Sequence, residues 1–225
     1  MTFAVLAAAA AFALIYWARF AGRDEGRQPW AGTAVKTAST ALLVVAGVLG
    51  DAPTLIVIGL ALGAAGDFAL SRPGTAAFLA GMAAFAAGHL AYVWAFWTRA
   101  AELGFSAPTP GHWVAIAVLM ALILGLGLWL SSKAGDLRLP VLGYALVIGA
   151  MAATVLILPP NAGRKDILLG AGLFLLSDAL LALRMFVVTA PKARLALGLA
   201  VWPAYWMGQA LILIGSVIYW TFPKV

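Results

Sequence analysis

The chain has 225 residues, of which 64% are hydrophobic and only 10% are charged. Globular domains carry about 25% charged residues, so this composition excludes a soluble domain and indicates a chain that faces lipid. The formal net charge is +6, but Lys and Arg are scattered singly or in pairs and form no basic stripe, which argues against a nucleic-acid partner.

Apolar runs near the length that crosses a bilayer, about 20 residues, predict an all-α polytopic bundle of about eight transmembrane helices in one membrane domain, residues 1–225. The breaks between the runs carry Gly, Pro or charge, as loops do. The first run is followed, not preceded, by arginines, so we interpret it as a retained helix and not as a signal peptide. The predicted spans are 2–18, 34–50, 54–70, 75–97, 113–130, 139–158, 167–183 and 195–222.

The 14 Lys and Arg residues are divided unevenly between the two sides of this bundle. The positive-inside rule therefore places the odd-numbered loops in the cytoplasm and both termini on the non-cytoplasmic side. We expect the protein in the plasma (inner) membrane of a bacterium. The odd-loop side holds Arg19, Arg23, Arg27, Lys36, Arg72, Lys133, Arg138, Arg184, Lys192 and Arg194, whereas the other side holds Arg99, Arg164, Lys165 and Lys224.

Two aspartates, Asp67 and Asp178, fall inside predicted spans. A charged group at the centre of a membrane helix costs about 3 kcal/mol on insertion scales, so it normally faces the bundle interior and marks a function. Both lie towards the cytoplasmic end of their spans, Asp178 a little deeper, and we expect them to share one cavity. The alternative for Asp67 is an interfacial residue paired with Arg72. The same interfacial interpretation is the alternative for Asp178, although the run LLGAGLFLLSDALLALRMF offers no nearby loop.

The two aspartates are about half the chain apart, and their spans run in the same direction. This spacing is compatible with a parallel four-plus-four pseudo-repeat. Small residues fill many spans, and Gly59 and Gly63 are candidate points of close helix crossing.

Other polar side chains within the spans are candidate substrate contacts. Lys36, at the cytoplasmic entry of the second span, either snorkels to lipid phosphates or holds an anionic group of a substrate. His89 either fills a packing position or exchanges a proton with a carboxylate. The remaining candidates are Tyr92, Tyr144, Ser177, Tyr205 and Gln209.

Several chemistries lack the residues that they require. The chain has no cysteine, which excludes disulfide bonds and a thiol nucleophile, and its two histidines are too few for a three-histidine zinc site. No GxSxG, SxxK or HExxH motif is present. We therefore expect no metal and no cofactor, and paired carboxylates remain as the candidate catalysts.

Four segments resemble the YhhN/TMEM86 family of membrane proteins, which includes the lysoplasmalogenases. They are Lys36-Thr37 with Thr40, Gly66-Asp67 before a Pro-containing turn, GHLAYVWAF from Gly88, and the run PVLGYALVIGAMA, LGAGLFLLSDALLAL and YWMGQALILIG. Together they cover roughly residues 36 to 215 in order.

This resemblance implies hydrolysis of the vinyl-ether bond of a lysoplasmalogen, a lysophospholipid, to a fatty aldehyde and a glycerophospho-ethanolamine or -choline, with Asp67 and Asp178 at the family's two acidic positions. Vinyl ethers cleave by protonation at carbon, which suits one neutral carboxyl as acid and one ionised carboxylate, as in glycosidases. We expect Asp178 as the proton donor because it is the deeper of the two. Two alternatives remain open, a proton-coupled transporter or lipid flippase and a non-catalytic membrane protein.

Overall fold

The computed structural model describes residues 2–104 and 109–221, and within these it contains eight α-helices, one short 3₁₀ helix and no strand. The all-α prediction is therefore confirmed. Phe222, at the end of the last predicted span, and Lys224, in the charge count, lie outside the described residues. The helices are α1 (Thr2–Arg19), α2 (Trp30–Leu49), α3 (Thr54–Leu70), α4 (Thr75–Glu102), α5 (Pro110–Ser131), η1 (Gly135–Leu137), α6 (Arg138–Leu156), α7 (Arg164–Phe186) and α8 (Pro191–Thr221).

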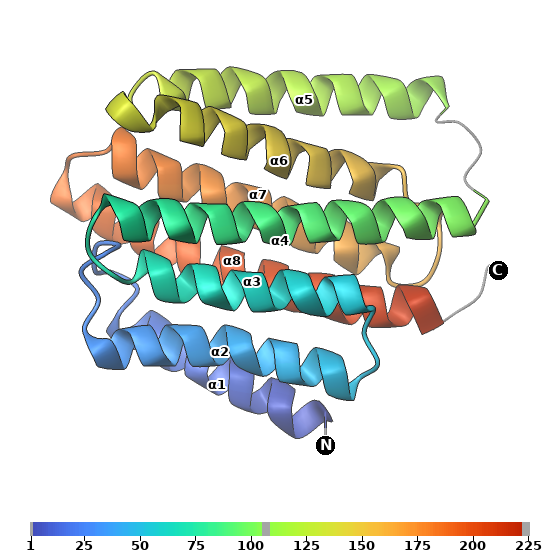
Figure 1. Ribbon diagram of the computed structural model, residues 1–225, viewed down its shortest axis with the longest axis horizontal. Coiled ribbons are helices and arrows are strands. Elements are labelled where there is room, and N and C mark those ends of the chain that lie inside the picture. The colour runs from blue at the N-terminus through green and yellow to red at the C-terminus, as the bar shows by residue number, and fades with distance from the viewer. Residues whose placement is uncertain (1, 105–108, 222–225) are drawn as a thin grey trace.

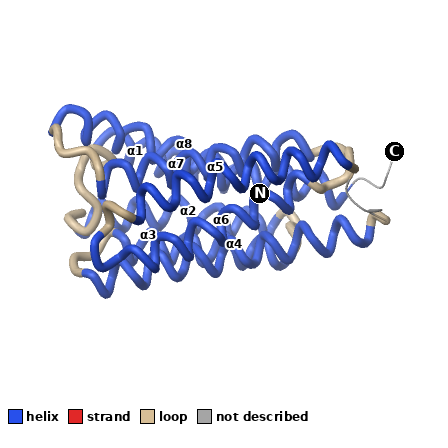
Figure 2. The backbone as a smooth tube through the Cα atoms, turned by 90° about the horizontal axis from the view of Figure 1, so that it is seen from above, coloured by secondary structure: helices blue, strands red, loops and turns tan. Residues whose placement is uncertain are grey.

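The helices lie side by side, and successive helices run in opposite directions (Figures 1 and 2). The most extensive contacts are between neighbours in the chain, namely α7–α8, α3–α4, α1–α2, α2–α3 and α5–α6. Helix α8 also contacts α1, α2 and α3, whereas α4 contacts α6. Contacts of α8 with α1, α2 and α3 and of α4 with α6 therefore join the first half of the chain to the second. The pseudo-repeat stays a prediction.

Seven of the eight helices in the described chain are long and apolar enough to cross a membrane. The eighth, α3, has 17 residues, which is the lower end of the range of about 17–25 that spans a bilayer. The chain is thus a multi-pass membrane protein. Its short third helix matters because it carries Asp67 on its last turns.

Glycines on α3 permit two large polar side chains to enter the core. A Cβ added to Gly59 would overlap the ring of Tyr92, and one added to Gly63 would lie 2.6 Å from Nε2 of Gln209. A side chain at position 59 would therefore displace the ring of Tyr92, and one at position 63 would displace the amide of Gln209, so glycine permits the close approach of α4 and α8.

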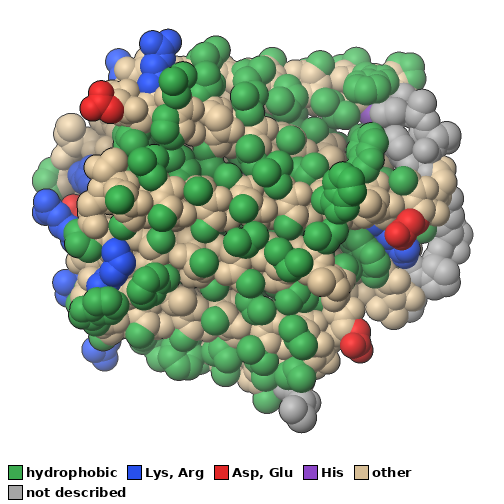
Figure 3. All heavy atoms as spheres, in the orientation of Figure 1, with side chains coloured by type: hydrophobic (Ala, Val, Ile, Leu, Met, Phe, Trp, Pro, Cys, Tyr) green, Lys and Arg blue, Asp and Glu red, His purple; other side chains and the backbone are tan. Residues whose placement is uncertain are grey.

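The two ends of the bundle differ in charge. The α1–α2, α3–α4, α5–α6 and α7–α8 connections all lie at the left end in Figure 1. Most of the Lys and Arg side chains visible in Figure 3 gather at this same end. The apolar flanks of the bundle separate this basic end from the opposite end, which carries the N-terminus. The described fold therefore has the charge asymmetry that was counted along the sequence.

Candidate active site

A cavity of about 100 Å³, here called the central cavity, opens within the basic half of the bundle. Every α-helix except α5 contributes to its wall, as does the α1–α2 loop. The wall is mostly apolar, with Phe, Leu, Met, Val and Trp side chains. Its polar members are Tyr16, Glu25, Lys36, Asp67, Tyr144, Ser177, Asp178 and Tyr205.

Asp67 is fixed by three partners from two other helices. Its Oδ2 accepts hydrogen bonds from Thr40 Oγ1 at 2.6 Å and from Tyr205 Oη at 2.9 Å. Its Oδ1 lies 3.5 Å from Lys36 Nζ. Charge-assisted bonds of this kind stabilise a buried carboxylate that would otherwise lose its hydration. The contacts hold the carboxylate in one position on the cavity wall.

The expected pairing of Asp67 with Arg72 is wrong for this fold. The side chain of Asp67 is 1% exposed. Arg72 turns away from it and donates to Gln28 O at 2.9 Å and to Thr33 Oγ1, with its guanidinium 4.0 Å from the ring centre of Trp30. The reason is that α2 and α8 bring better partners to Asp67 than the turn at the end of its own helix provides.

Asp178 lies on α7 and contacts α6 and α4. Its Oδ2 accepts a hydrogen bond from Tyr144 Oη at 2.8 Å and lies 3.7 Å from His89 Nε2. His89 Nε2 is 3.2 Å from the same Tyr144 oxygen. The imidazole packs edge-on against the ring of Phe174, with centroids 4.5 Å apart. His89 does not line the cavity, but it orients Tyr144 and Asp178 from behind.

The expected order of burial is reversed. Asp178 is expected from the sequence to be the deeper carboxyl, yet its side chain is 19% exposed, against 1% for Asp67. Depth along one helix does not determine burial, because burial depends on the neighbouring helices. Asp67 faces the contact of α2, α3 and α8, whereas Asp178 faces open cavity.

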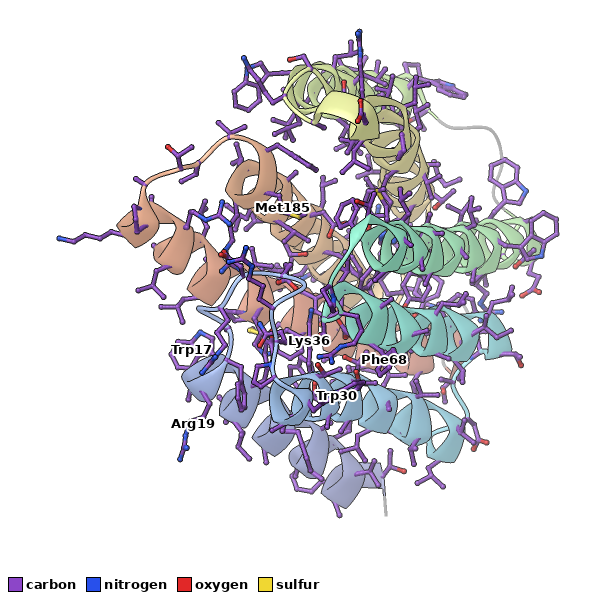
Figure 4. The ribbon with its side chains drawn as sticks, turned by 60° about the vertical axis from the view of Figure 1, so that its left-hand side comes forward. Trp17, Arg19, Trp30, Lys36, Phe68 and Met185 are labelled. Atoms are coloured by element: carbon purple, nitrogen blue, oxygen red, sulfur yellow. The ribbon has the colours of Figure 1, made fainter. Side chains whose placement is uncertain are left out.

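Lys36 points into the bundle and not towards lipid phosphates (Figure 4). Its Nζ lies 3.5 Å from Glu25 Oε2 as well as 3.5 Å from Asp67 Oδ1. Glu25 and Thr40 are site residues that were not among the candidates chosen from the sequence. A signal for Thr40 was its position one turn after Lys36 on α2, which places both side chains on one helix face. Glu25 lies in a polar loop, where the sequence offers no such signal.

Tyr92 and Gln209 do not line the cavity; they bind each other, and Gln209 also bonds Tyr205 of the cavity wall. Tyr92 Oη donates to Gln209 Oε1 at 2.6 Å, and each residue is 1% exposed. Ser177 does line the cavity, although its hydroxyl donates to Phe174 O at 2.7 Å. The structure thus brings Lys36, Ser177 and the aspartates to one cavity, together with Tyr144 and Tyr205.

The α1–α2 loop lines the cavity with Ala21 and Glu25 and is bound by two arginines. Arg184 of α7 is 2% exposed and donates to Gly22 O at 3.1 Å and Arg23 O at 2.8 Å. Arg194 donates to Asp24 Oδ1 at 2.7 Å. This hydrogen bond holds the pKa of Asp24 below its usual value, against a smaller opposing effect of burial. The anchored loop carries Glu25 to the cavity.

Residues 31–216 match the YhhN family. The chain belongs to this family. The match covers α2 to α8, and therefore every helix that holds Lys36, the two aspartates and their tyrosine partners. No solved structure matches the chain.

Three similar proteins carry the name lysoplasmalogenase TMEM86B. The Homo sapiens protein is 38% identical over 162 residues, which are 70% of this chain and 61% of that protein. The Sus scrofa protein is 35% identical over 84% of this chain and 76% of its own length. The Rattus norvegicus protein is 32% identical over 86% of this chain and 76% of its own length. The matched region therefore spans less than two thirds of the human relative.

Proposed function

We propose that this protein is a membrane hydrolase that cleaves the vinyl-ether bond of lysoplasmalogens. The observation that carries the proposal is that Asp67 and Asp178, from opposite halves of the chain, line the same cavity. The relatives named lysoplasmalogenase support the choice of substrate. The products are a fatty aldehyde and a glycerophospho-ethanolamine or -choline.

The chemistry requires a proton donor and an acceptor close to one bond. Protonation of the vinyl-ether carbon that does not bear oxygen yields an oxocarbenium ion, which a carboxylate stabilises and water attacks. The resulting hemiacetal loses the glycerol alcohol and becomes an aldehyde, so one water molecule is consumed. A carboxylic acid and a carboxylate supply both groups without a nucleophilic serine or cysteine.

The partners of the two carboxyls favour different roles for them. The cation of Lys36 compensates a negative charge on Asp67, which suits the carboxylate that stabilises the cation and activates water. Among the described residues no Lys or Arg pairs with Asp178, so its charge is compensated less. We assign Asp178 as the acid and Tyr144 as the residue that orients it. Lys36, Ser177 and Tyr205 then face the polar part of the substrate.

We further propose that the protein lies in the plasma membrane of a bacterium with both termini on the non-cytoplasmic side. The concentration of Lys and Arg at one end of the bundle supports this orientation (Figure 3). The cavity would then open towards the inner leaflet and receive its lipid from there. A reporter fused to the C-terminus and active only in the cytoplasm should stay inactive. An active reporter would reverse the orientation.

The direct test is aldehyde release from a lysoplasmalogen by the purified protein. Asp67→Asn and Asp178→Asn should each lower kcat by about 100-fold or more, the usual contribution of a general acid or base. Asp136→Asn, in the exposed α5–α6 connection, is the matched control and should retain activity. Full activity of either core variant would rule out the two-carboxylate mechanism, and release of no aldehyde by the unaltered protein would rule out the substrate.

A further inference from the structure

A second cavity lies beside the central one, between α5, α6 and α7. It has a volume of about 360 Å³, and we call it the lateral groove. Its walls come from residues 119–130 of α5, 141–148 of α6 and 172–182 of α7. Apart from Tyr144 and Asp178, every lining residue is Leu, Ile, Val, Ala or Gly. A groove of this composition suits a hydrocarbon ligand and offers nothing to a charged one.

The lateral groove and the central cavity meet at four shared residues. Val141, Tyr144, Asp178 and Ala182 line both. The hydrogen bond between Tyr144 and Asp178 therefore lies at the junction. On the side of the central cavity the walls carry Glu25, Lys36 and Asp67, whereas on the side of the lateral groove the walls are apolar. The charged groups of the combined space therefore lie on one side only, as in a lipid with a polar head and one apolar chain.

The length and position of the lateral groove match one leaflet. Residues 119–130 of α5 extend over about 16 Å at 1.5 Å per residue, which is about half of a hydrocarbon core of roughly 30 Å. The groove begins near the ends of α5 and α7 at the basic end and runs towards the middle of these helices. The hydrocarbon chain of a lipid whose head group lies at the basic end of the bundle would extend over the same depth of the bilayer.

The lateral groove is also open to the side of the bundle. Leu122 of α5 and Leu176 of α7, which both line the groove, are 67% and 49% exposed. In Figure 1 the α5–α6 pair lies at one edge of the bundle, next to α7. In a bilayer this edge faces lipid, so a chain enters the groove without crossing water.

We propose that the lateral groove binds the single hydrocarbon chain of a lysolipid, with the head group in the central cavity and the bond between them at Asp178 and Tyr144. The position of the reacting bond rests on the proposed function, whereas the binding of the chain does not. The groove thereby selects for chain length.

Two glycines provide a matched pair of variants. A Cβ added to Gly172 meets no heavy atom within 4 Å, and Gly172 lines the lateral groove. A Cβ added to Gly143 is equally unobstructed, but Gly143 lines neither cavity. Both positions are exposed and helical. Phenylalanine at position 172 therefore occupies the groove, while phenylalanine at position 143 adds the same bulk outside it.

The first experiment compares long-chain with short-chain lysoplasmalogens. Gly172→Phe should lower kcat/KM for the long chain by about tenfold, the effect of losing a few methylene contacts, and should spare the short chain. Gly143→Phe should leave both values unchanged. An equal loss for both chain lengths in Gly172→Phe, or no loss at all, would overturn the groove while leaving the proposed function intact.

The second experiment measures binding without turnover. A photoactivatable long-chain lysophosphatidylcholine should crosslink to the groove residues of the unaltered protein and of Gly143→Phe, but not to those of Gly172→Phe. This result would support the groove even if no vinyl ether were hydrolysed. Crosslinking outside the groove in all three proteins would overturn the proposal. Thermal unfolding in detergent controls for folding of the variants.

Discussion

Lys36 Nζ lies 3.5 Å from Asp67 Oδ1, and the two side chains are only 6% and 1% exposed. The same ammonium lies 3.5 Å from Glu25 Oε2. One buried cation thus serves two carboxylates, one from a loop and one from α3. The loss of this cation leaves two negative charges in the core, whereas the loss of Asp67 leaves Lys36 with a remaining partner.

Lys36→Met should therefore destabilise the protein more than Asp67→Asn does. Removal of one partner from a buried pair costs about 3–5 kcal/mol, because an uncompensated charge stays behind. The double variant should lose less than the sum of the single losses, since the neutral amide that replaces Asp67 needs no cation. Thermal unfolding in detergent measures the stability of the two single variants and of the double variant.

Lys192→Met is the control for this series, because Lys192 is exposed on the first turn of α8. It should unfold like the unaltered protein. Strictly additive losses in the double variant would contradict a coupled pair.

Tyr144→Phe should lower kcat by about 10–100-fold. The variant removes the hydrogen bond that Tyr144 Oη donates to Asp178, and a bond to a charged or reacting carboxyl contributes about 1.5–3 kcal/mol. The rate of aldehyde release at saturating lysoplasmalogen is the measurement.

Tyr92→Phe is the matched variant, since Tyr92 is also a buried tyrosine but binds Gln209 and does not line the cavity. It should lower stability by about 1–3 kcal/mol through the unpaired amide oxygen and leave kcat close to that of the unaltered protein. The reverse pattern, with kcat dependent on Tyr92 and not on Tyr144, would refute the assignment of Tyr144.

The contact between Asp24 and Arg194 should make the α1–α2 loop sensitive to acid. The hydrogen bond from Arg194 lowers the pKa of Asp24 in the folded protein. The stabilisation is therefore fully present above the ordinary aspartate pKa of about 3.9 and is lost as the pH falls below it. Asp24 is 42% exposed, so the contact contributes less than about 1 kcal/mol.

Hydrogen exchange of residues 20–29, corrected for the intrinsic effect of pH, measures this opening. Asp24→Asn should accelerate exchange at neutral pH to the rate that the unaltered loop reaches in acid. Asp51→Asn, in the exposed α2–α3 turn at the other end of the bundle, should change nothing in this loop. Unchanged exchange in Asp24→Asn would show that the contact of Asp24 with Arg194 does not hold the loop.

The sequence by itself determined the class of the protein, its helices and its two unusual aspartates. These follow from local physics, because about 20 apolar residues must form a helix in lipid and a carboxyl within them stands out against that background. Gly59 and Gly63 were also recognisable, since close helix crossing requires small residues on one face.

Only the tertiary structure decided which groups surround each aspartate. Glu25 stands in the polar segment GRDEGRQPW and is indistinguishable in sequence from a solvated loop residue. It reaches Lys36 because Arg184 and Arg194 draw the loop against α7 and α8. Such contacts join residues far apart in the chain, and the hydropathy of either segment does not encode them. The same holds for the burial of Asp67, which depends on Thr40 and Tyr205 from two other helices.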